Sequence, residues 1–192
     1  VGTIDGGAGQ DEVDYSAYTS SVVASFGQFV DVEKLTDSGE GADTLLGSDA
    51  ADIFSITDTN DGTVQRATGG TILSFQDWEN LNGGSGQDLF DFDSNLSVLT
   101  GSIDGGSTSE SDSLTASGVT ADVGYVLQGM GASSGFSGTA GGLLGTFTNI
   151  DFLSGGLSSN DSLTGLDAVS IWSIATAGTY TTSGRSAVFT SI

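Results

Sequence analysis

A short pattern recurs five times along the chain: an apolar residue, a glycine-rich turn, an aspartate and, two positions after the aspartate, a second apolar residue. The five copies begin at Ile4, Leu35, Leu81, Ile103 and Leu153. Glycine adopts the positive φ angles of tight turns without strain, and apolar residues two positions apart occupy one face of a strand. The pattern therefore predicts short strands joined by tight turns, and it argues against a helical fold.

Two longer matches place this pattern inside larger repeats. Residues 102–106 resemble residues 3–7, and residues 161–174 resemble residues 43–56. Self-similarity of this kind is typical of architectures in which each unit stacks on the next. We therefore interpret the chain as about two copies of a unit of about 100 residues.

The two matches have different offsets, which indicates that the second copy carries about 19 extra residues. The glycine- and serine-rich residues 129–145 are the expected position of this insertion. We predict a first long repeat at residues 1–101 and a second at residues 102–192, which is cut short at its C-terminal end. Both repeats are expected to form one continuous solenoid.

The segments between the glycine-rich turns are short, alternate in hydrophobicity and are spaced as in an all-β sandwich or a solenoid. Each segment is too small to bury a core alone, which favours stacking. The 31 Gly residues suit the turns of such a fold, and the absence of Pro suits continuous ladders. We predict an all-β chain folded as a right-handed parallel β-helix (β-solenoid). Two tandem antiparallel β-sandwich domains are the alternative.

The charge balance excludes several classes of function. The chain has 25 Asp and Glu against 3 Lys and Arg, which gives a formal net charge of −22. Nucleic acid and anionic membranes both attract basic proteins, so neither is an expected partner. No apolar run approaches the ~20 residues of a membrane-spanning helix, so no membrane insertion is expected. Without His or Cys, the chain lacks the residues of the usual zinc sites and of His-based triads.

The glycine-rich turns resemble those of a known family. Residues 6–13 and 83–90 fit the calcium-binding nonapeptide of the RTX family, Gly-Gly-x-Gly-x-Asp-x-apolar-x, and residues 38–45 fit it with one substitution. The long repeat is similar to the arrays of very large secreted bacterial surface proteins of the adhesin, filamentous-haemagglutinin-like and biofilm-matrix types. This resemblance implies a β-solenoid in a larger secreted protein, with an extracellular or cell-surface location.

The same resemblance implies calcium, a hard cation that takes 6–8 oxygen ligands. The expected ligands are the motif aspartates and their neighbours: Asp11, Asp43 and Asp88 from the motif, and Asp5, Asp49 and Asp52 beside them. In the RTX family consecutive turns share each ion, whereas here the motif copies lie tens of residues apart. The alternative is that each aspartate caps its own turn by accepting backbone hydrogen bonds. Both interpretations stay open, and no organic cofactor is expected.

Catalysis and ice binding are the less favoured functions. A β-helix glycosidase needs two converging carboxylates, but the acid pairs of this chain lie in repeated turns, so we do not expect an enzyme. The candidate pairs are Asp91 with Asp93 and Asp49 with Asp52. Ice binding needs regular Thr-x-Thr rows, and residues 57–59 and 179–181 are isolated examples.

A carbohydrate- or surface-binding adhesin module is the main alternative function. Such a module presents aromatic side chains, and Trp78, Tyr15 and Tyr18 are the candidates for surface contacts. Trp78 stands in a polar segment, which predicts a surface position. Trp172 replaces Phe54 of the first repeat, which predicts a place in the core.

The favoured function is a structural module of an extracellular repeat protein: a fibre, stalk or surface-layer subunit. A solenoid that ends between turns leaves apolar residues and strand edges uncovered. Identical copies then stack head to tail and form filaments. The expected partner is therefore a second copy of the chain, with a glycan or surface ligand as a further partner.

Overall fold

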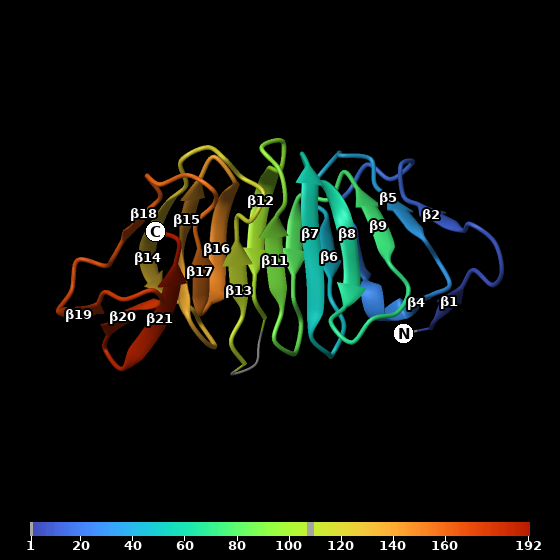
Figure 1. Cartoon of the computed structure of the whole chain (residues 1–192). Helices are drawn as coiled ribbons and strands as arrows, with labels where there is room; N and C mark the ends of the chain where they lie inside the picture. Colours follow the sequence, from blue (N-terminus) through green and yellow to red (C-terminus); the bar gives the residue numbers. More distant parts are fainter. Residues whose placement is uncertain (1, 107–109) are drawn as a thin grey trace.

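The computed structural model describes residues 2–106 and 110–192, and this part of the chain is all-β. One 3-10 turn, η1 (Phe26–Gln28), interrupts the strands. Two short strands, β1 (Ile4–Asp5) and β4 (Phe29–Val30), pair in parallel near the N-terminus. The other described strands belong to two long sheets, which lie one behind the other in Figure 1.

The eight-stranded sheet has the order β18-β14-β15-β16-β12-β10-β6-β3. Its strands are β3 (Val23–Ser25), β6 (Thr44–Leu46), β10 (Asn80–Asn82), β12 (Leu99–Asp104), β14 (Gly124–Met130), β15 (Phe136–Gly141), β16 (Leu144–Ile150) and β18 (Ser162–Thr164). Neighbouring strands are parallel except at β15, which is antiparallel to β14 and β16.

The eleven-stranded sheet has the order β19-β20-β21-β17-β13-β11-β7-β8-β9-β5-β2. Its strands are β2 (Glu12–Asp14), β5 (Lys34–Thr36), β7 (Asp52–Asp58), β8 (Asp61–Arg66), β9 (Leu73–Gln76), β11 (Leu89–Phe92), β13 (Ser113–Thr115), β17 (Phe152–Ser154), β19 (Ser170–Ser173), β20 (Gly178–Thr182) and β21 (Arg185–Thr190). Here β8 and β20 are antiparallel to both neighbours, and the other pairs are parallel.

The chain alternates between the two sheets. A strand of the eight-stranded sheet is followed, after a turn, by a strand of the eleven-stranded sheet, and we call such a pair a rung. The rungs β6–β7, β10–β11 and β12–β13 lie side by side in both sheets, although β8 and β9 separate the first two in sequence. The parallel pairing follows from this path, because each rung enters each sheet in the same direction.

The core between the sheets consists of apolar residues in register from rung to rung. In the eight-stranded sheet the aligned positions are Ala24, Leu45, Leu81, Ile103 and Phe147. In the eleven-stranded sheet they are Phe54, Phe90, Leu114, Leu153 and Phe189. All ten side chains are buried, and their neighbours along the strands are more exposed, as the two-residue period of a strand requires.

Three antiparallel meanders interrupt the alternation: β7–β8–β9, β14–β15–β16 and β19–β20–β21. Each meander folds back, so that its last strand pairs in parallel with a strand that precedes the meander, namely β5, β12 or β17. The middle strand is antiparallel, so the outer two strands keep the direction of the rungs.

The internal repeats reappear as equivalent elements. β5, β6 and β7 correspond to β17, β18 and β19, each 118 residues later. Both β7 and β19 begin a meander in the eleven-stranded sheet. Residues 129–145, the expected insertion, contain β15, and the boundary predicted between residues 101 and 102 lies inside β12. Both sheets continue across that boundary.

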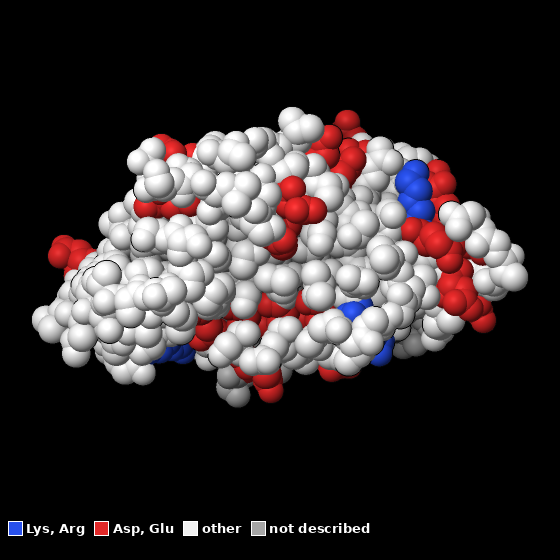
Figure 2. All heavy atoms as spheres, viewed as in Figure 1, with Lys and Arg blue, Asp and Glu red and all other residues white. Residues whose placement is uncertain are grey.

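The prediction of an all-β chain of short strands is confirmed, and the sheets are rich in parallel pairs. The alternative of two antiparallel sandwich domains is wrong, because antiparallel pairing among the described strands is confined to the three meanders. In the described part of the chain, no helix has the length and hydrophobicity to cross a bilayer. Figure 2 shows acidic side chains gathered at the end that holds β1 and β2.

Candidate functional site

Five turns are built around a contact between a glycine and the aspartate that ends the turn. A Cβ added at any of these glycines would lie 2.3–2.9 Å from an atom of that aspartate side chain. The pairs are Gly6 with Asp11, Gly47 with Asp52, Gly83 with Asp88, Gly105 with Asp112, and Gly155 with Asp161. Glycine is therefore required, because the aspartate and, at four of the five positions, an even closer backbone carbonyl oxygen fill the space of a side chain.

The aspartates of successive rungs form a hydrogen-bonded ladder where the strands of the eleven-stranded sheet begin. The Asp52 backbone N–H donates to Asp88 Oδ1 at 2.8 Å, and the Asp88 N–H donates to Asp112 Oδ1 at 2.8 Å. The Asp112 N–H in turn donates to Asp151 Oδ2 at 3.4 Å. Each carboxylate thereby joins its own turn to the neighbouring rung. Burial raises the pKa of Asp88 to about 8 and that of Asp112 to about 7, and neighbouring carboxylates act in the same direction.

The predicted calcium ligands lie in different surroundings. Asp5 is exposed, and its Oδ1 accepts the Gly7 N–H at 3.0 Å, as in an Asx turn. Asp11 is half-buried and Asp49 is exposed. Asp52 and Asp88 are buried in the ladder, where backbone N–H groups bind them. The sixth candidate, Asp43, is the one that the fold brings into a compact group of acids.

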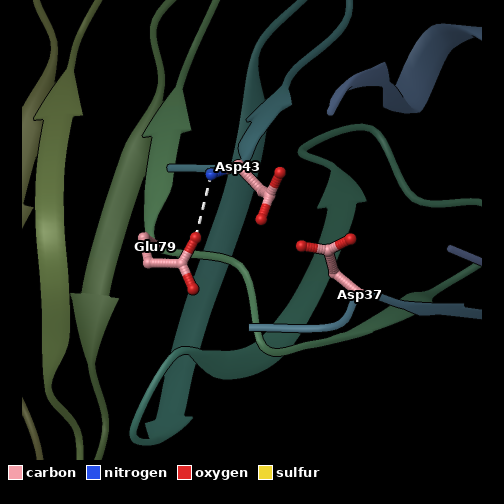
Figure 3. A group of neighbouring side chains, drawn as sticks. All are labelled: Asp37, Asp43 and Glu79. Atoms are coloured by element: carbon pink, nitrogen blue, oxygen red, sulfur yellow. Dashed lines mark hydrogen bonds between the residues drawn. The ribbon is translucent and has the colours of Figure 1, made fainter. Parts of the chain in front are cut away.

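That group consists of Asp37, Asp43 and Glu79. One oxygen from each lies within 4.8 Å of the others, and no other set of three acids in residues 2–106 and 110–192 is this compact. Figure 3 shows the three carboxylates directed toward one another, and the Asp43 N–H donates to Glu79 Oε2 at 2.9 Å. Asp37 follows β5, Asp43 precedes β6 and Glu79 precedes β10, so two neighbouring crossings between the sheets supply the group.

The group is electrostatically strained as a set of anions. Asp37 is 2 % exposed and Asp43 is 0 % exposed, and both Asp37 oxygens and Asp43 Oδ2 have no hydrogen-bond partner. Burial and the adjacent Asp43 carboxyl raise the pKa of Asp37 to about 7. Burial also raises the pKa of Glu79. Buried carboxylates without partners are costly, so the group requires a proton or a cation.

Two of these acids, Asp37 and Glu79, were missed in the sequence. Glu79 lies 36 positions after Asp43, and the register of β6 with β10 brings them together. Asp37 did carry a signal, because the matching position 118 residues later is Gly155. An acid at a position that is otherwise glycine indicates that this turn has a role that the other turns lack.

The aromatic candidates are not arranged as a surface patch. The surface position predicted for Trp78 is wrong, because its side chain is 0 % exposed, with its ring 6.0 Å from that of Tyr15. Tyr15 is half-buried, and Tyr18 is 55 % exposed. Trp172, predicted in the core, is 41 % exposed. Apolar neighbours in space, not the polar neighbours in sequence, decide the burial of Trp78.

In each acid pair considered for catalysis, one member makes structural contacts and the other is exposed. Asp91 accepts hydrogen bonds from the hydroxyls of Thr115 and Ser117, at 2.6 and 2.7 Å, in the neighbouring strand and turn. Asp93 is exposed. Within the second pair, Asp52 is buried in the ladder and Asp49 points to solvent.

The last rung, β18–β19, presents apolar residues that nothing covers in the described structure. β18 and β19 are the terminal strands of the two sheets. Ile174 is 78 % exposed, whereas Ile56, its counterpart in the first repeat, is fully buried. Val169 and Ile171 add to this exposed apolar surface at 95 % and 70 %, although their counterparts Ala51 and Ile53 are only half-buried. In the first repeat β10 and β11 cover the equivalent surface.

Comparisons with known proteins do not assign the chain to a family. No family model matches the chain, and none of the curated proteins or solved structures searched gave a match.

Proposed function

We propose that the chain is a structural module of the β-solenoid kind, which serves as a fibre, stalk or surface-layer subunit and associates end to end. The rungs and their aligned apolar positions support this proposal. A stack of rungs has no intrinsic last member, because every rung offers the next one the same apolar positions and free strand edges. We also propose a right-handed solenoid and an extracellular location, because the glycine-rich turns resemble the RTX nonapeptide.

The exposure of the last rung is the observation that carries the proposal. Ile56 and Phe54 are fully buried because Phe92 and Phe90 pair with them in the next rung. Trp172 in β19 and Ile174 directly after β19 occupy the equivalent positions in the last rung, and no further rung follows them. Exposed apolar side chains grouped in this way are typical of an interaction surface.

The occupant that we propose for this surface is the N-terminal end of a second copy. β2 and β3 are the terminal strands at the N-terminal end of the two sheets, and Val23 in β3 is 66 % exposed. Residues 162–174 contain one charged residue, Asp167, so this end lacks the charge density of the rest of the chain. Contact between unlike ends is heterologous, and it propagates into a filament.

Sedimentation velocity over a range of concentrations tests the association. The chain is expected to form species larger than a monomer, and Ile174→Asp is expected to shift them toward monomer, because it places a charge in the apolar end. Leu96→Asp is the matched control, since Leu96 is 64 % exposed and lies in the turn before β12. A chain that stays monomeric at high concentration, with and without added calcium, contradicts the proposal.

A polar groove supports glycan or surface binding as a second candidate function. Its volume is about 340 Å³, and its lining includes Asp49, Asn82, Asp104, Ser133 and Asn149. Carboxylate, amide and hydroxyl groups of this kind bind sugar hydroxyls. Screening the chain against immobilised glycans, with Asp49→Ala and Ser133→Ala as groove variants, tests this function. Equal retention of the parent and both variants would count against the groove.

A further inference from the structure

Asp37 occupies a position that is glycine in the equivalent turns. In five turns a glycine packs against the aspartate that ends the turn. The turn from Asp37 to Asp43 has the same length as the turn from Gly155 to Asp161, which lies 118 residues later. Gly155 has no room for a side chain, since a Cβ there would lie 2.5 Å from Asp161 Oδ2. In the first repeat this place holds a second carboxylate.

The turn that holds Asp37 has three buried carboxylate oxygens without donors, whereas turns that keep the glycine have at most one, as at Asp11 Oδ2 and Asp88 Oδ2. In the second repeat both Asp161 oxygens are satisfied, because Val123 N–H and Gly156 N–H each donate to one of them at 2.7 Å. In the first repeat Val22 N–H makes the equivalent bond to Asp43 Oδ1, but Asp43 Oδ2 has no partner. The two oxygens of Asp37 also have none.

Glu79 adds a third carboxylate from the neighbouring crossing. Its side chain holds the Asp43 backbone N–H, and an oxygen of each acid lies within 4.8 Å of the other two. Oxygens about 2.4 Å from a common calcium ion lie at most about 4.8 Å apart, so the three carboxylates are close enough to share one ion. The nearest basic residue in sequence, Lys34, is paired with Glu12 at 3.0 Å.

We infer that Asp37, Asp43 and Glu79 bind a divalent cation, with calcium the best match to an all-oxygen ligand set. Two of the three ligands lie outside the glycine-rich motif aspartates. The cation joins the turn between β5 and β6 to the segment between β9 and β10, which follows the first meander. The site does not depend on end-to-end association, and either proposal can fail without the other.

Calcium titration of the chelator-treated full chain tests the site. Isothermal titration calorimetry and thermal unfolding are measured for the parent, Asp37→Gly, Glu79→Gln and Asp93→Asn. Asp37→Gly restores the glycine found at position 155, so this variant is expected to fold, as circular dichroism will check. Asp93→Asn is the control, because it removes an exposed charge that is not part of the acid group.

The parent and Asp93→Asn are expected to bind calcium and to unfold at a higher temperature when it is present. Asp37→Gly and Glu79→Gln are expected to bind at least about tenfold more weakly, because the site loses ligands and charge. Without calcium, Asp37→Gly is expected to be at least as stable as the parent. The inference is overturned if calcium gives no heat and no shift in the parent, or if Asp37→Gly and Glu79→Gln bind calcium as the parent does. Preferential binding of Mg²⁺ would overturn the assignment to calcium.

Discussion

The ring of Phe54 stacks on the ring of Phe90, with the centroids 5.0 Å apart and 13° between the planes. The two residues are direct partners in β7 and β11, and both are fully buried. Trp172, the counterpart of Phe54 in the last rung, has no such partner ahead of it. It packs on Tyr180 and Phe189 of its own meander, with centroids 4.7 and 5.9 Å away. The inner pair thus shows the contact that the last rung lacks.

Removing one ring of the inner stack should destabilise the chain strongly. Phe90→Ala is expected to lower the free energy of unfolding by about 3–5 kcal/mol, because it leaves a cavity between rungs that cannot collapse. Trp172→Ala is the comparison, and a smaller loss is expected because Trp172 is partly in contact with solvent. Urea unfolding followed by circular dichroism measures both. Equal losses would mean that stacking between rungs adds nothing to the core.

The contact between Gly83 and Asp88 gives a second prediction. A Cβ at position 83 would lie 2.3 Å from Asp88 Oδ2 and 2.6 Å from the Gly105 carbonyl oxygen. Gly83→Ala is therefore expected to destabilise the chain by about 1–3 kcal/mol. Gly124→Ala is the control, because the nearest atom to its Cβ would be 3.6 Å away. Thermal unfolding that ranks Gly124→Ala as the more damaging change would contradict the packing described for the turn.

The aspartate ladder predicts that stability falls as the pH rises. The pKa values of Asp88 and Asp112 are about 8 and 7 in the folded chain, above the usual value of 3.8. The folded chain therefore holds more protons than the unfolded chain between pH 4 and 8. This contribution to stability is fully present below about pH 4 and is lost as the pH rises through 7 and 8.

Unfolding midpoints measured between pH 5 and 9, without calcium, test this dependence. The midpoint is expected to fall across the range. Asp88→Asn should reduce the slope, because the amide oxygen still accepts the Asp52 N–H but carries no titrating charge. A midpoint that climbs from pH 5 to 9 would show that the ladder carboxylates are not held protonated by burial.

The parts of the fold set by local chemistry could be predicted from the sequence. Gly83 and Asp88 belong to a turn pattern whose positive φ angles only glycine adopts easily, and that pattern fixed the turns and the short strands. The meanders could not be predicted in the same way. Nothing local distinguishes β8 from a strand that crosses to the other sheet, because pairing direction depends on partners distant in sequence.

The candidate site shows the same division. Asp43 was predicted as a ligand from its motif, whereas Glu79 reaches it only through the pairing of β6 with β10. Trp78 was misplaced because its neighbours Asp77 and Glu79 are polar, although its ring packs inward against Tyr15. In each case the residue type was visible in the sequence, but its neighbours were set by the register of the sheets.

Arg185 provides the last prediction, because it ties the terminal meander to the turn between β14 and β15. Its Nη1 donates to the backbone carbonyls of Gly131, Ser134 and Gly135, and its Nη2 reaches Ser133 at 3.4 Å. Arg185→Ala is expected to leave these carbonyls to solvent and to speed amide hydrogen exchange across residues 131–135.

Arg185→Lys separates charge from geometry. Lysine keeps the charge but lacks the planar set of donors, so it should restore only part of the protection. Hydrogen exchange measured by mass spectrometry gives the order expected: parent most protected, Arg185→Lys intermediate, Arg185→Ala least. Full protection in Arg185→Lys would mean that a single positive charge holds the turn and that the guanidinium geometry is dispensable.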